Sequence, residues 1–428
     1  MSQAKSARKS AHVADVAVLG CGIVGLSIAY QLQRRGLSCL LIDPRGPAGD
    51  ASFGNAGSVS VGNLFPQAVP GTIKSALRGL RNPLAPLKLD WPALPQYAGW
   101  LWRFAQQARW DRVEQSLAGL QALNAHARQA WLDLAEAVDA RDLIGETGYL
   151  HVYSEDATFA GNAWAREHLR TQGVAHDVLD ASQLRELEPG IAGIARHGVL
   201  QRDSLFVRDP GAFCRRLFDH LSARGVQTLT DRATAIRAEG AGYQVQTEQD
   251  CVHVDQVVMA AGAWSTALLR PLGVRLPVAA ARGYHAAYAA QADLVRRPTL
   301  WAERYLVVSP MAASIRVTGF KEMTAPDRPA RPDLMQALAP EARRLFPALS
   351  AAPPRSIWSG LRPCTPDSLP ILDQLPGERI FVATGHGHLG LTQGPISGEL
   401  MVARMMGEAP RIPMDAYRLD RFGAATLS

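Results

Sequence analysis

The sequence predicts an α/β fold in which a discontinuous Rossmann-like domain joins a second domain built on a mostly antiparallel sheet with helices. Three patterns indicate this fold. A strand, glycine-rich turn, helix and second strand lie near the N-terminus, alternating residues cover 278–320, and a strand, glycine-rich turn and helix return near the C-terminus. Of the 428 residues, 47% are hydrophobic, which is enough for two packed domains.

The N-terminal unit begins after a polar segment, 1–13, that we expect to be a flexible tail. An apolar strand is predicted at 16–19, a helix at 23–35 and a second strand at 38–42. Glycines at motif spacing interrupt the apolar run, so it is not interpreted as a secretory signal. No apolar stretch reaches the roughly 18–20 residues that a membrane-spanning helix needs.

The turn of this unit reads Gly20-Cys21-Gly22-Ile23-Val24-Gly25, the GxGxxG pattern of dinucleotide-binding proteins. Gly20 allows a tight turn, Gly22 lets the backbone approach a pyrophosphate, and Gly25 lets helix and strand pack closely. The helix N-terminus offers unpaired N–H groups to the phosphates. Asp43, at the end of the second strand, is expected to accept hydrogen bonds from ribose hydroxyls.

Two later glycine-rich segments favour FAD over NAD as the dinucleotide. The first, 51–57, lies in a long loop, 44–70, whose small residues let the backbone run under a flat ring. The second is the turn at 384–390, which follows a strand at 379–383 and precedes a helix expected after Pro395. An ordinary βα turn remains the alternative for the second segment. A buried strand that ends in small residues at 257–264 supports the same interpretation more weakly.

Charge and cysteine content exclude several classes of protein. The net charge of +6 fits an anionic cofactor, an acidic substrate, an anionic membrane surface or simply a solvated basic surface. Lys and Arg do not alternate with aromatics in a stripe, so no nucleic acid is expected as a partner. The five cysteines are scattered without a CxxC pair, which argues against a metal site and a disulfide framework and favours a cytoplasmic protein.

Arg362 is the candidate for substrate binding. It lies in the run Ser359-Gly360-Leu361-Arg362-Pro363-Cys364-Thr365-Pro366-Asp367, between small residues and prolines. An arginine held in this way suits a bidentate grip on a carboxylate. A structural ion pair with Asp367 or another acid is the alternative.

Together these motifs resemble the D-amino-acid oxidase superfamily of FAD-dependent oxidoreductases, and most closely the small-subunit type of bacterial D-amino acid dehydrogenase. The resemblance runs from about residue 15 to about residue 408. It rests on the segments 20–25, 52–57, 147–150, 209–211, 282–284, 360–367 and 384–390.

The resemblance implies non-covalent FAD with its adenine end in the N-terminal unit. In monomeric sarcosine oxidases a cysteine shortly after the Arg-Pro stretch binds flavin covalently, but Cys364 lies within that stretch and does not match it. The residues expected to contact FAD, including the glycines of the motif, are Gly20, Gly22, Ile23, Val24, Gly25, Asp43, Pro44, Ala51, Ser52, Asn55, Ala56, Gly57, Ser58, Ala233, Gly262, Gly385, His386, Gly387, His388, Leu389, Gly390, Leu391 and Thr392.

The resemblance also implies that Arg362 binds the substrate carboxylate, as the matching arginine does in glycine oxidases. Those relatives have an arginine where this chain has His388, so the substrate pocket differs. Tyr284, Tyr305, His386 and His388 are candidates for orienting the substrate. Each is equally well explained as a packed aromatic or a satisfied histidine.

The expected reaction is oxidative deamination of a D-amino acid by hydride transfer from the α-carbon to flavin N5. Electrons would pass to a quinone or another acceptor that is not oxygen. A D-proline or cis-4-hydroxy-D-proline dehydrogenase and a glycine- or sarcosine-type amine oxidase are alternatives within the superfamily. An NAD-dependent dehydrogenase and a flavin subunit that acts only inside a larger complex are alternatives from other classes. The sequence does not predict the oligomeric state.

The FAD-binding domain is predicted to comprise 14–90, 190–275 and 356–410, and the substrate-binding domain 91–189 and 276–355. Helices are expected over 91–142. One helical face there carries Trp100, Leu101, Phe104, Ala105 and Ala108. This face fits either a peripheral contact with the inner face of the cytoplasmic membrane or a buried helix that covers the active site.

Overall fold

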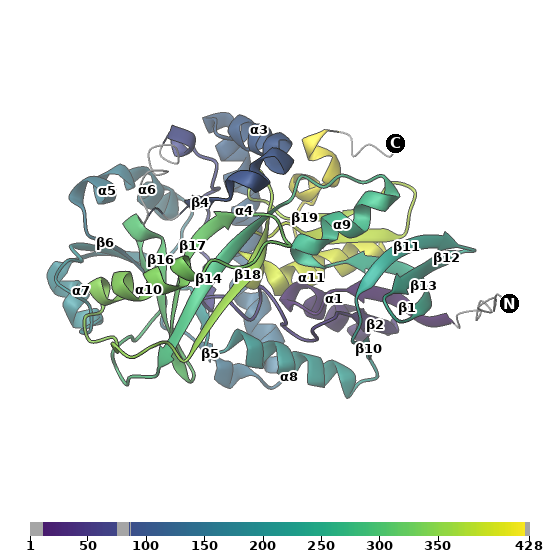
Figure 1. The fold of residues 1–428 in the computed structure, drawn as a ribbon, viewed down its shortest axis with the longest axis horizontal. Coiled ribbons are helices and arrows are strands. Elements are labelled where there is room, and N and C mark those ends of the chain that lie inside the picture. Colours follow the sequence, from purple (N-terminus) through teal and green to yellow (C-terminus); the bar gives the residue numbers. More distant parts are fainter. Residues whose placement is uncertain (1–11, 75–84, 86, 424–428) are drawn as a thin grey trace.

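The computed structural model describes residues 12–74, 85 and 87–423, and it confirms the predicted α/β class (Figure 1). A flexible tail was expected at 1–13. Its residues 1–11 lie outside the described part of the chain, and the first strand begins at His12. Two large sheets and one small sheet organise the chain. In Figure 1 the first sheet lies on the right and the second on the left.

The first sheet is the Rossmann-like one, in the order β10-β2-β1-β13-β12-β11, with β20 paired to β13 and β19 to β20. Strands β10, β2, β1, β13 and β20 are parallel, whereas β11, β12 and β19 are antiparallel to their neighbours. The strands are β1 (His12–Leu19), β2 (Cys39–Ile42), β10 (Gln227–Leu229), β11 (Ala233–Glu239), β12 (Gly242–Thr247), β13 (Cys251–Met259), β19 (Ile371–Gln374) and β20 (Ile380–Thr384).

The second sheet is largely antiparallel, in the order β18-β14-β17-β16-β15-β6-β8-β7, with β4 paired to β17. Only the pairs β15–β6 and β17–β4 are parallel among its described strands. The strands are β4 (Leu87–Leu89), β6 (Tyr149–Tyr153), β7 (His176–Asp180), β8 (His197–Gln201), β14 (Ala279–Ala289), β15 (Thr299–Trp301), β16 (Leu306–Met311), β17 (Ser314–Met323) and β18 (Ser356–Cys364). The small sheet is β3 (Ser58–Val59), β5 (Ile144–Gly145) and β9 (Leu205–Val207).

Helices cover both large sheets. Four of them, α1, α4, α8 and α11, share one apolar core with alternate residues of β1 and β2, and α10 packs on the second sheet. The helices are α1 (Ile23–Arg34), α3 (Ala98–Gln107), α4 (Trp110–Ala137), α5 (Asp156–Gly161), α6 (Ala163–Thr171), α7 (Ala181–Leu187), α8 (Pro210–Ser222), α9 (Ser265–Leu269), α10 (Pro332–Leu345) and α11 (Gly390–Met406). Among the described residues, no helix is both long and apolar enough to span a bilayer.

Helix α11 begins at Gly390, whereas the sequence predicted its start after Pro395. A proline inside a helix removes one N–H, which leaves the carbonyl four residues earlier without its usual donor. Here that carbonyl belongs to Leu391, and the indole Nε1–H of Trp131 donates to it at 2.8 Å. The long-range contact from α4 therefore compensates for Pro395 and lets the helix start earlier.

Sheet membership differs from the predicted domain division at three places. β18 pairs with β14 in the second sheet, although the predicted boundary at 356 assigned it to the cofactor side. β8 and β4 also belong to the second sheet. Conversely, α4 contributes to the core of the first sheet. Composition does not reveal these memberships, because they depend on pairing between segments far apart in the chain.

Candidate active site

One large cavity of about 1720 Å³ is lined by residues of both large sheets. Pockets for small molecules usually measure about 300–1,000 Å³, so this cavity has room for a large ligand together with a second one. It extends from the turn between β1 and α1, past the loop 44–70, to strands β17 and β18 and the turn before α11. The two predicted glycine-rich ends of the chain therefore meet in one place.

The turn between β1 and α1 has the close contacts that the GxGxxG motif predicts. Gly20 has a φ of +114°, and a Cβ there would lie 2.5 Å from the carbonyl oxygen of Ala260. A Cβ on Gly25 would lie 1.9 Å from the carbonyl oxygen of Gly20, so helix and strand touch at this point. Gly22, Ile23 and Val24 line the cavity, and the hydroxyl oxygen of Ser52 accepts a hydrogen bond from the backbone N–H of Ile23 at 3.0 Å.

Asp43 lines the same end of the cavity, together with Pro44 and Ala233. Its Oδ2 accepts a hydrogen bond from the backbone N–H of Cys21 at 3.0 Å, and Oδ1 accepts one from the N–H of Arg45 at 2.8 Å. Each carboxylate oxygen has two acceptor positions, so contact with ribose hydroxyls remains available to Asp43.

The loop 44–70 is held from the second sheet by Arg316. Its Nη1 donates to the carbonyl oxygens of Phe53 at 2.8 Å and Asn55 at 2.6 Å. Burial lowers the pKa of Arg316 to about 10, so it stays charged at neutral pH. Asn55 Oδ1 accepts from the N–H of Gly57 at 2.8 Å, which closes a local turn. The loop is thus a fixed wall of the cavity.

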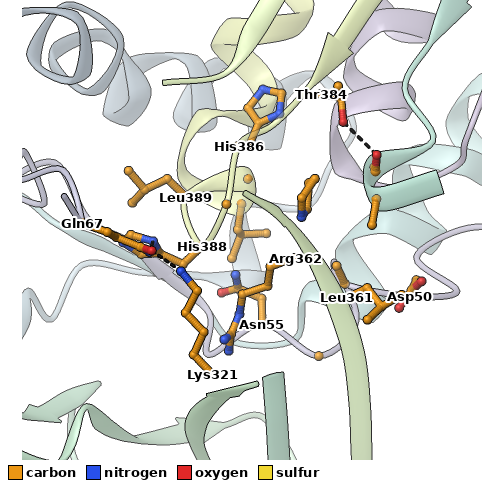
Figure 2. A pocket seen from close by; sticks show the side chains of 18 of the residues that line it. Asp50, Asn55, Gln67, Lys321, Leu361, Arg362, Thr384, His386, His388 and Leu389 are labelled. Atoms are coloured by element: carbon orange, nitrogen blue, oxygen red, sulfur yellow. Dashed lines mark hydrogen bonds between the residues drawn. The ribbon is translucent and has the colours of Figure 1, made fainter. Parts of the chain in front are cut away.

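The turn before α11 and the first turn of that helix contribute the residues from His386 to Thr392 to the lining. No side chain of the described residues caps the N-terminus of α11. The ring Nε2 of His386 is 2.9 Å from the hydroxyl of Ser397, and burial lowers the His386 pKa to about 4. At neutral pH this imidazole is therefore uncharged. Thr384 Oγ1 donates to the carbonyl of Gly262 at 2.8 Å and ties this turn to the end of β13 (Figure 2).

Arg362 extends over Gly283 of the neighbouring strand. A Cβ on Gly283 would lie 2.3 Å from its Nη2, so only glycine leaves room for the guanidinium. Nη1 donates to the carbonyl of Phe320 at 3.3 Å, and Arg362 forms no ion pair with any described carboxylate. The ion pair with Asp367 that the sequence left open is absent, because Asp367 pairs with Arg421 at 2.8 Å. Burial lowers the pKa of Arg362.

His388 lies beside Arg362 in a chain of polar side chains (Figure 2). Its Nδ1 is 2.9 Å from Nε2 of Gln67, and its Nε2 is 3.1 Å from Nδ2 of Asn63. The ammonium of Lys321 donates to Oε1 of the same Gln67. Burial, followed by the charges of Lys321 and Arg362, lowers the pKa of His388 to about 3.

The two candidate tyrosines lie in different places. Tyr305 is 67% exposed and lines the cavity. Tyr284 is fully buried, is absent from the cavity lining, and donates its hydroxyl to Glu322. Its side chain packs with the core under α10, on the face of β14 opposite Gly283. The structure therefore removes Tyr284 from the residues that can touch a substrate in this cavity.

Most of the other expected cofactor residues line the cavity, and three do not. Gly25, Gly57 and Gly385 lie behind the lining, where added side chains would meet Gly20, Phe206 and Thr365. The lining residues among the expected set are Gly20, Gly22, Ile23, Val24, Asp43, Pro44, Ala51, Ser52, Asn55, Ala56, Ser58, Ala233, Gly262, His386, Gly387, His388, Leu389, Gly390, Leu391 and Thr392.

The sequence reasoning missed Asn63, Gln67, Lys321 and Trp358, all of which line the cavity. None lies in a recognised motif. Lys321 lies in the segment 315–323, which also contains Arg316 and Glu322, so its charge gave no distinct signal.

Helix α3 covers the cavity, as one of the two interpretations of the tryptophan-rich segment predicts. Trp100, Leu101, Phe104 and Ala105 line the cavity, and the Trp100 indole donates to the carbonyl of Cys364 at 2.9 Å. Trp102 is 61% exposed on the other side of the helix. Membrane contact through this outer side stays a prediction.

These residues fit an FAD molecule. The turn at Gly20 and Gly22 leaves space in front of α1, and the N-termini of α1 and α11 both border the cavity. The hydroxyls of Ser58 and Thr318 are buried, line the cavity and have no hydrogen-bond partner within the described part of the chain. Polar atoms in that position suit a ligand whose own polar groups can form hydrogen bonds with them. All five cysteines are described, and none lines the cavity.

Comparison with known proteins agrees with this arrangement. Residues 15–404 match the family model DAO, described as FAD dependent oxidoreductase. A D-amino acid dehydrogenase of Dechloromonas aromatica is 32% identical over 92% of this chain and 97% of its own length. A D-amino-acid oxidase of Bradyrhizobium diazoefficiens is 31% identical over 95% of this chain and 98% of its own.

Solved structures resemble the fold at lower identity. The crystal structure of glycine oxidase from Geobacillus kaustophilus superimposes with a TM-score of 0.78 at 20% identity, covering 96% of this chain and 99% of that one. The match over almost the whole chain and the fit of the cavity lead to one conclusion. The chain belongs to the DAO family of FAD-dependent oxidoreductases.

Proposed function

We propose that this protein is a D-amino acid dehydrogenase with non-covalent FAD, which takes a hydride from the α-carbon and passes electrons to an acceptor other than oxygen. The observation that carries the proposal is the guanidinium of Arg362. It lines the cavity with one long hydrogen bond and no carboxylate partner in the described chain. A half-buried cation in this state suits the carboxylate of an amino acid.

The bound FAD would supply the hydride acceptor. Gly22 and the α1 N-terminus would hold its pyrophosphate, Asp43 its ribose, and the turn from His386 to Thr392 its flavin end. Arg362 would bind the substrate carboxylate and so determine which face of the α-carbon is presented. Helix α3 contributes Trp100 and Phe104 to the lining of the cavity.

The amine must be uncharged when the hydride leaves. The pKa values of about 4 for His386 and about 3 for His388 make both rings weak bases. We therefore propose that the amine proton leaves to water rather than to either histidine. The positive charges of Arg362 and Lys321 near the substrate site favour a neutral amine over an ammonium group.

Anaerobic bleaching of the flavin tests the substrate class. The purified protein would be mixed with D-amino acids, L-amino acids, glycine, sarcosine, D-proline and cis-4-hydroxy-D-proline, and the loss of yellow absorbance followed. We expect bleaching by several D-amino acids and none by their L-enantiomers. Bleaching by glycine or sarcosine alone would identify an amine oxidase of the same family. A stable yellow spectrum with every amine would contradict the proposal.

The electron acceptor needs a separate measurement. Relatives named both D-amino acid dehydrogenase and D-amino-acid oxidase match at similar identity, so similarity alone does not choose between acceptors. We expect rapid turnover with a dye or a soluble quinone and slow oxygen uptake without one. Fast production of hydrogen peroxide in air would contradict the choice of a non-oxygen acceptor. Release of all yellow colour on acid precipitation is expected for non-covalent FAD.

A further inference from the structure

Four side chains from three distant parts of the fold form one hydrogen-bonded chain. Lys321 comes from β17, Gln67 and Asn63 from the loop 44–70, and His388 from the turn before α11. Figure 2 shows Lys321 reaching Gln67 beside His388, with Arg362 adjacent. The direction of each hydrogen bond in such a chain is limited by which groups can donate and which can accept.

The ammonium of Lys321 can only donate, so the Gln67 atom that it contacts must be the carbonyl oxygen. The other end of the same amide, the NH₂ group, then faces Nδ1 of His388 and can only donate to it. Nδ1 must therefore be the unprotonated nitrogen of the ring. A neutral imidazole carries its one proton on the other nitrogen, Nε2.

The Nε2–H group of His388 then needs an acceptor, and Asn63 is its neighbour at 3.1 Å. Two amide NH₂ groups cannot both donate to a neutral imidazole, so one amide must present its oxygen. Lys321 fixes Gln67, and the oxygen of the Asn63 side chain has no other partner among the described contacts. The structure has Nδ2 of Asn63 nearest to this nitrogen, so the Nε2–H tautomer requires the Asn63 amide to be turned over, with Oδ1 toward His388.

We propose that Lys321 is a positioning residue that acts through Gln67 to fix His388 as the Nε2–H tautomer, so that a neutral, immobile imidazole lies next to Arg362. Both ring nitrogens are engaged, so His388 supports the shape of the carboxylate site and transfers no proton. The charged groups that act on the ring are Lys321 of β17 and Arg362 of β18, and both disfavour an imidazolium. This inference adds detail to the proposed function. The kinetic test of the inference rests on that function, whereas the spectroscopic tests do not.

Nitrogen NMR of the FAD-loaded protein with ¹⁵N-labelled histidine tests the tautomer without turnover. The chain has 11 histidines, and the His388→Asn variant identifies the signals to be followed. We expect Nδ1 of His388 at the shift of an unprotonated ring nitrogen and Nε2 at that of a protonated one. The opposite pattern, or an averaged pair of shifts, would overturn the proposal.

Two isosteric variants separate the roles of the amides. In Gln67→Glu the new carboxylate can only accept, so the proton of the neutral ring should move to Nδ1. In Asn63→Asp the new carboxylate accepts from Nε2–H, so the neutral ring should keep its tautomer. Both variants raise the His388 pKa, so the spectra are compared above it, at about pH 9. The same tautomer in both variants would overturn the proposal.

Variants of Lys321 connect the tautomer to substrate binding. Lys321→Met removes the donor that orients Gln67, so the two tautomers should mix and KM for the amino acid should rise about 10-fold or more. Lys321→Arg keeps a donor and should restore both readouts in part. An unchanged His388 spectrum in Lys321→Met would overturn the positioning role. If the spectra follow the expectation but no amine is oxidised, the proposed function fails and the tautomer assignment stands.

Discussion

Two arginines on the second sheet, the buried Arg316 of β17 and the half-buried Arg362 of β18, differ in their hydrogen-bond partners. Arg316 donates to two backbone carbonyls of the loop 44–70, at 2.8 and 2.6 Å. Arg362 makes one hydrogen bond to the described residues, at 3.3 Å, and reaches into the cavity. Neither forms an ion pair within the described part of the chain.

This difference in hydrogen-bond partners indicates different roles. Arg316 stabilises the fold, whereas Arg362 is positioned to bind a ligand. Burying a charge is costly unless hydrogen bonds compensate for the lost water. The protein supplies this compensation to Arg316 through two backbone carbonyls. Arg362 lacks it, which is consistent with a substrate carboxylate as the missing partner. Substitutions at the two positions should therefore have different consequences.

Arg316→Ala should give the largest loss of stability. It leaves the carbonyl groups of Phe53 and Asn55 without their donor, and a buried unpaired group costs about 1–3 kcal/mol. We expect the free energy of unfolding to fall by about 2–5 kcal/mol and FAD occupancy to fall with it, because this loop lines the cofactor cavity. Urea unfolding and the ratio of flavin to protein absorbance measure both effects. Full FAD occupancy with unchanged stability would contradict the structural role.

Arg362→Ala should instead reduce activity while leaving the fold and the cofactor in place. A charge-assisted hydrogen bond contributes about 1.5–3 kcal/mol, so kcat/KM should fall about 10- to 150-fold. Arg362→Lys keeps the charge but loses the planar fork, and an intermediate value is expected. Steady-state kinetics with a D-amino acid and a dye acceptor would measure this. Unchanged kinetics in the alanine variant would reject the carboxylate role.

The sequence predicted a role for Arg362 but not for Arg316. The residues that indicate the role of Arg362 are its neighbours in the sequence, whereas those that determine the role of Arg316 are far away in the chain. Arg362 lies in a local run with prolines and small residues, and the GxGxxG turn is likewise contained in six residues. The role of Arg316 depends on a loop more than 260 residues earlier in the chain, which β17 meets only after folding. Lys321, Gln67 and Asn63 were missed for the same reason.

Tyr284 shows a second limit of sequence reasoning. It follows Gly283 directly, and the sequence made it a candidate for orienting a substrate. Residues in a strand alternate between the two faces, so the neighbour of a residue that lies under Arg362 faces away from it. The register of β14 with β18, which pairs Gly283 with Gly360, was needed to decide which of the two lies under Arg362.

Gly283→Ala tests whether the position of Arg362 matters as much as its charge. The new Cβ would lie 2.3 Å from the Arg362 Nη2, so the guanidinium must move. Because misplacement by about 1 Å can cost up to 100-fold in rate, we expect kcat/KM to fall about 10- to 100-fold with FAD retained.

Gly198→Ala is the matched control, on strand β8 of the same sheet and outside the cavity lining. Its Cβ would lie 2.5 Å from the side chain of Leu184, in the core of the second sheet. It should lower stability and leave KM nearly unchanged. Equal effects of both variants on KM would mean that general disturbance of the sheet, rather than displacement of Arg362, explains the loss.

The smallest effect is expected from a change of pH, which alters the stability of the folded protein. This change protonates histidines near the cavity but leaves the charge of the two arginines unaltered. The pKa of His386 is lowered from 6.5 to about 4 and that of His388 to about 3, in both cases mainly by burial. Below about pH 6.5 the unfolded chain therefore binds protons that the folded protein does not. Stability from these groups is fully present above about pH 6.5 and falls as the pH drops toward 4.

Urea unfolding of the FAD-loaded protein at about pH 7.5 and about pH 5 measures this dependence. We expect a lower midpoint at the acid pH, and a smaller difference in His386→Gln, which no longer has a histidine to titrate at that position. Arg316, with a pKa of about 10, keeps its charge across the same range. FAD occupancy per folded molecule should then stay constant while stability falls. A loss of FAD before unfolding would show that a histidine charge, and not only the arginine-held loop, controls the cofactor cavity.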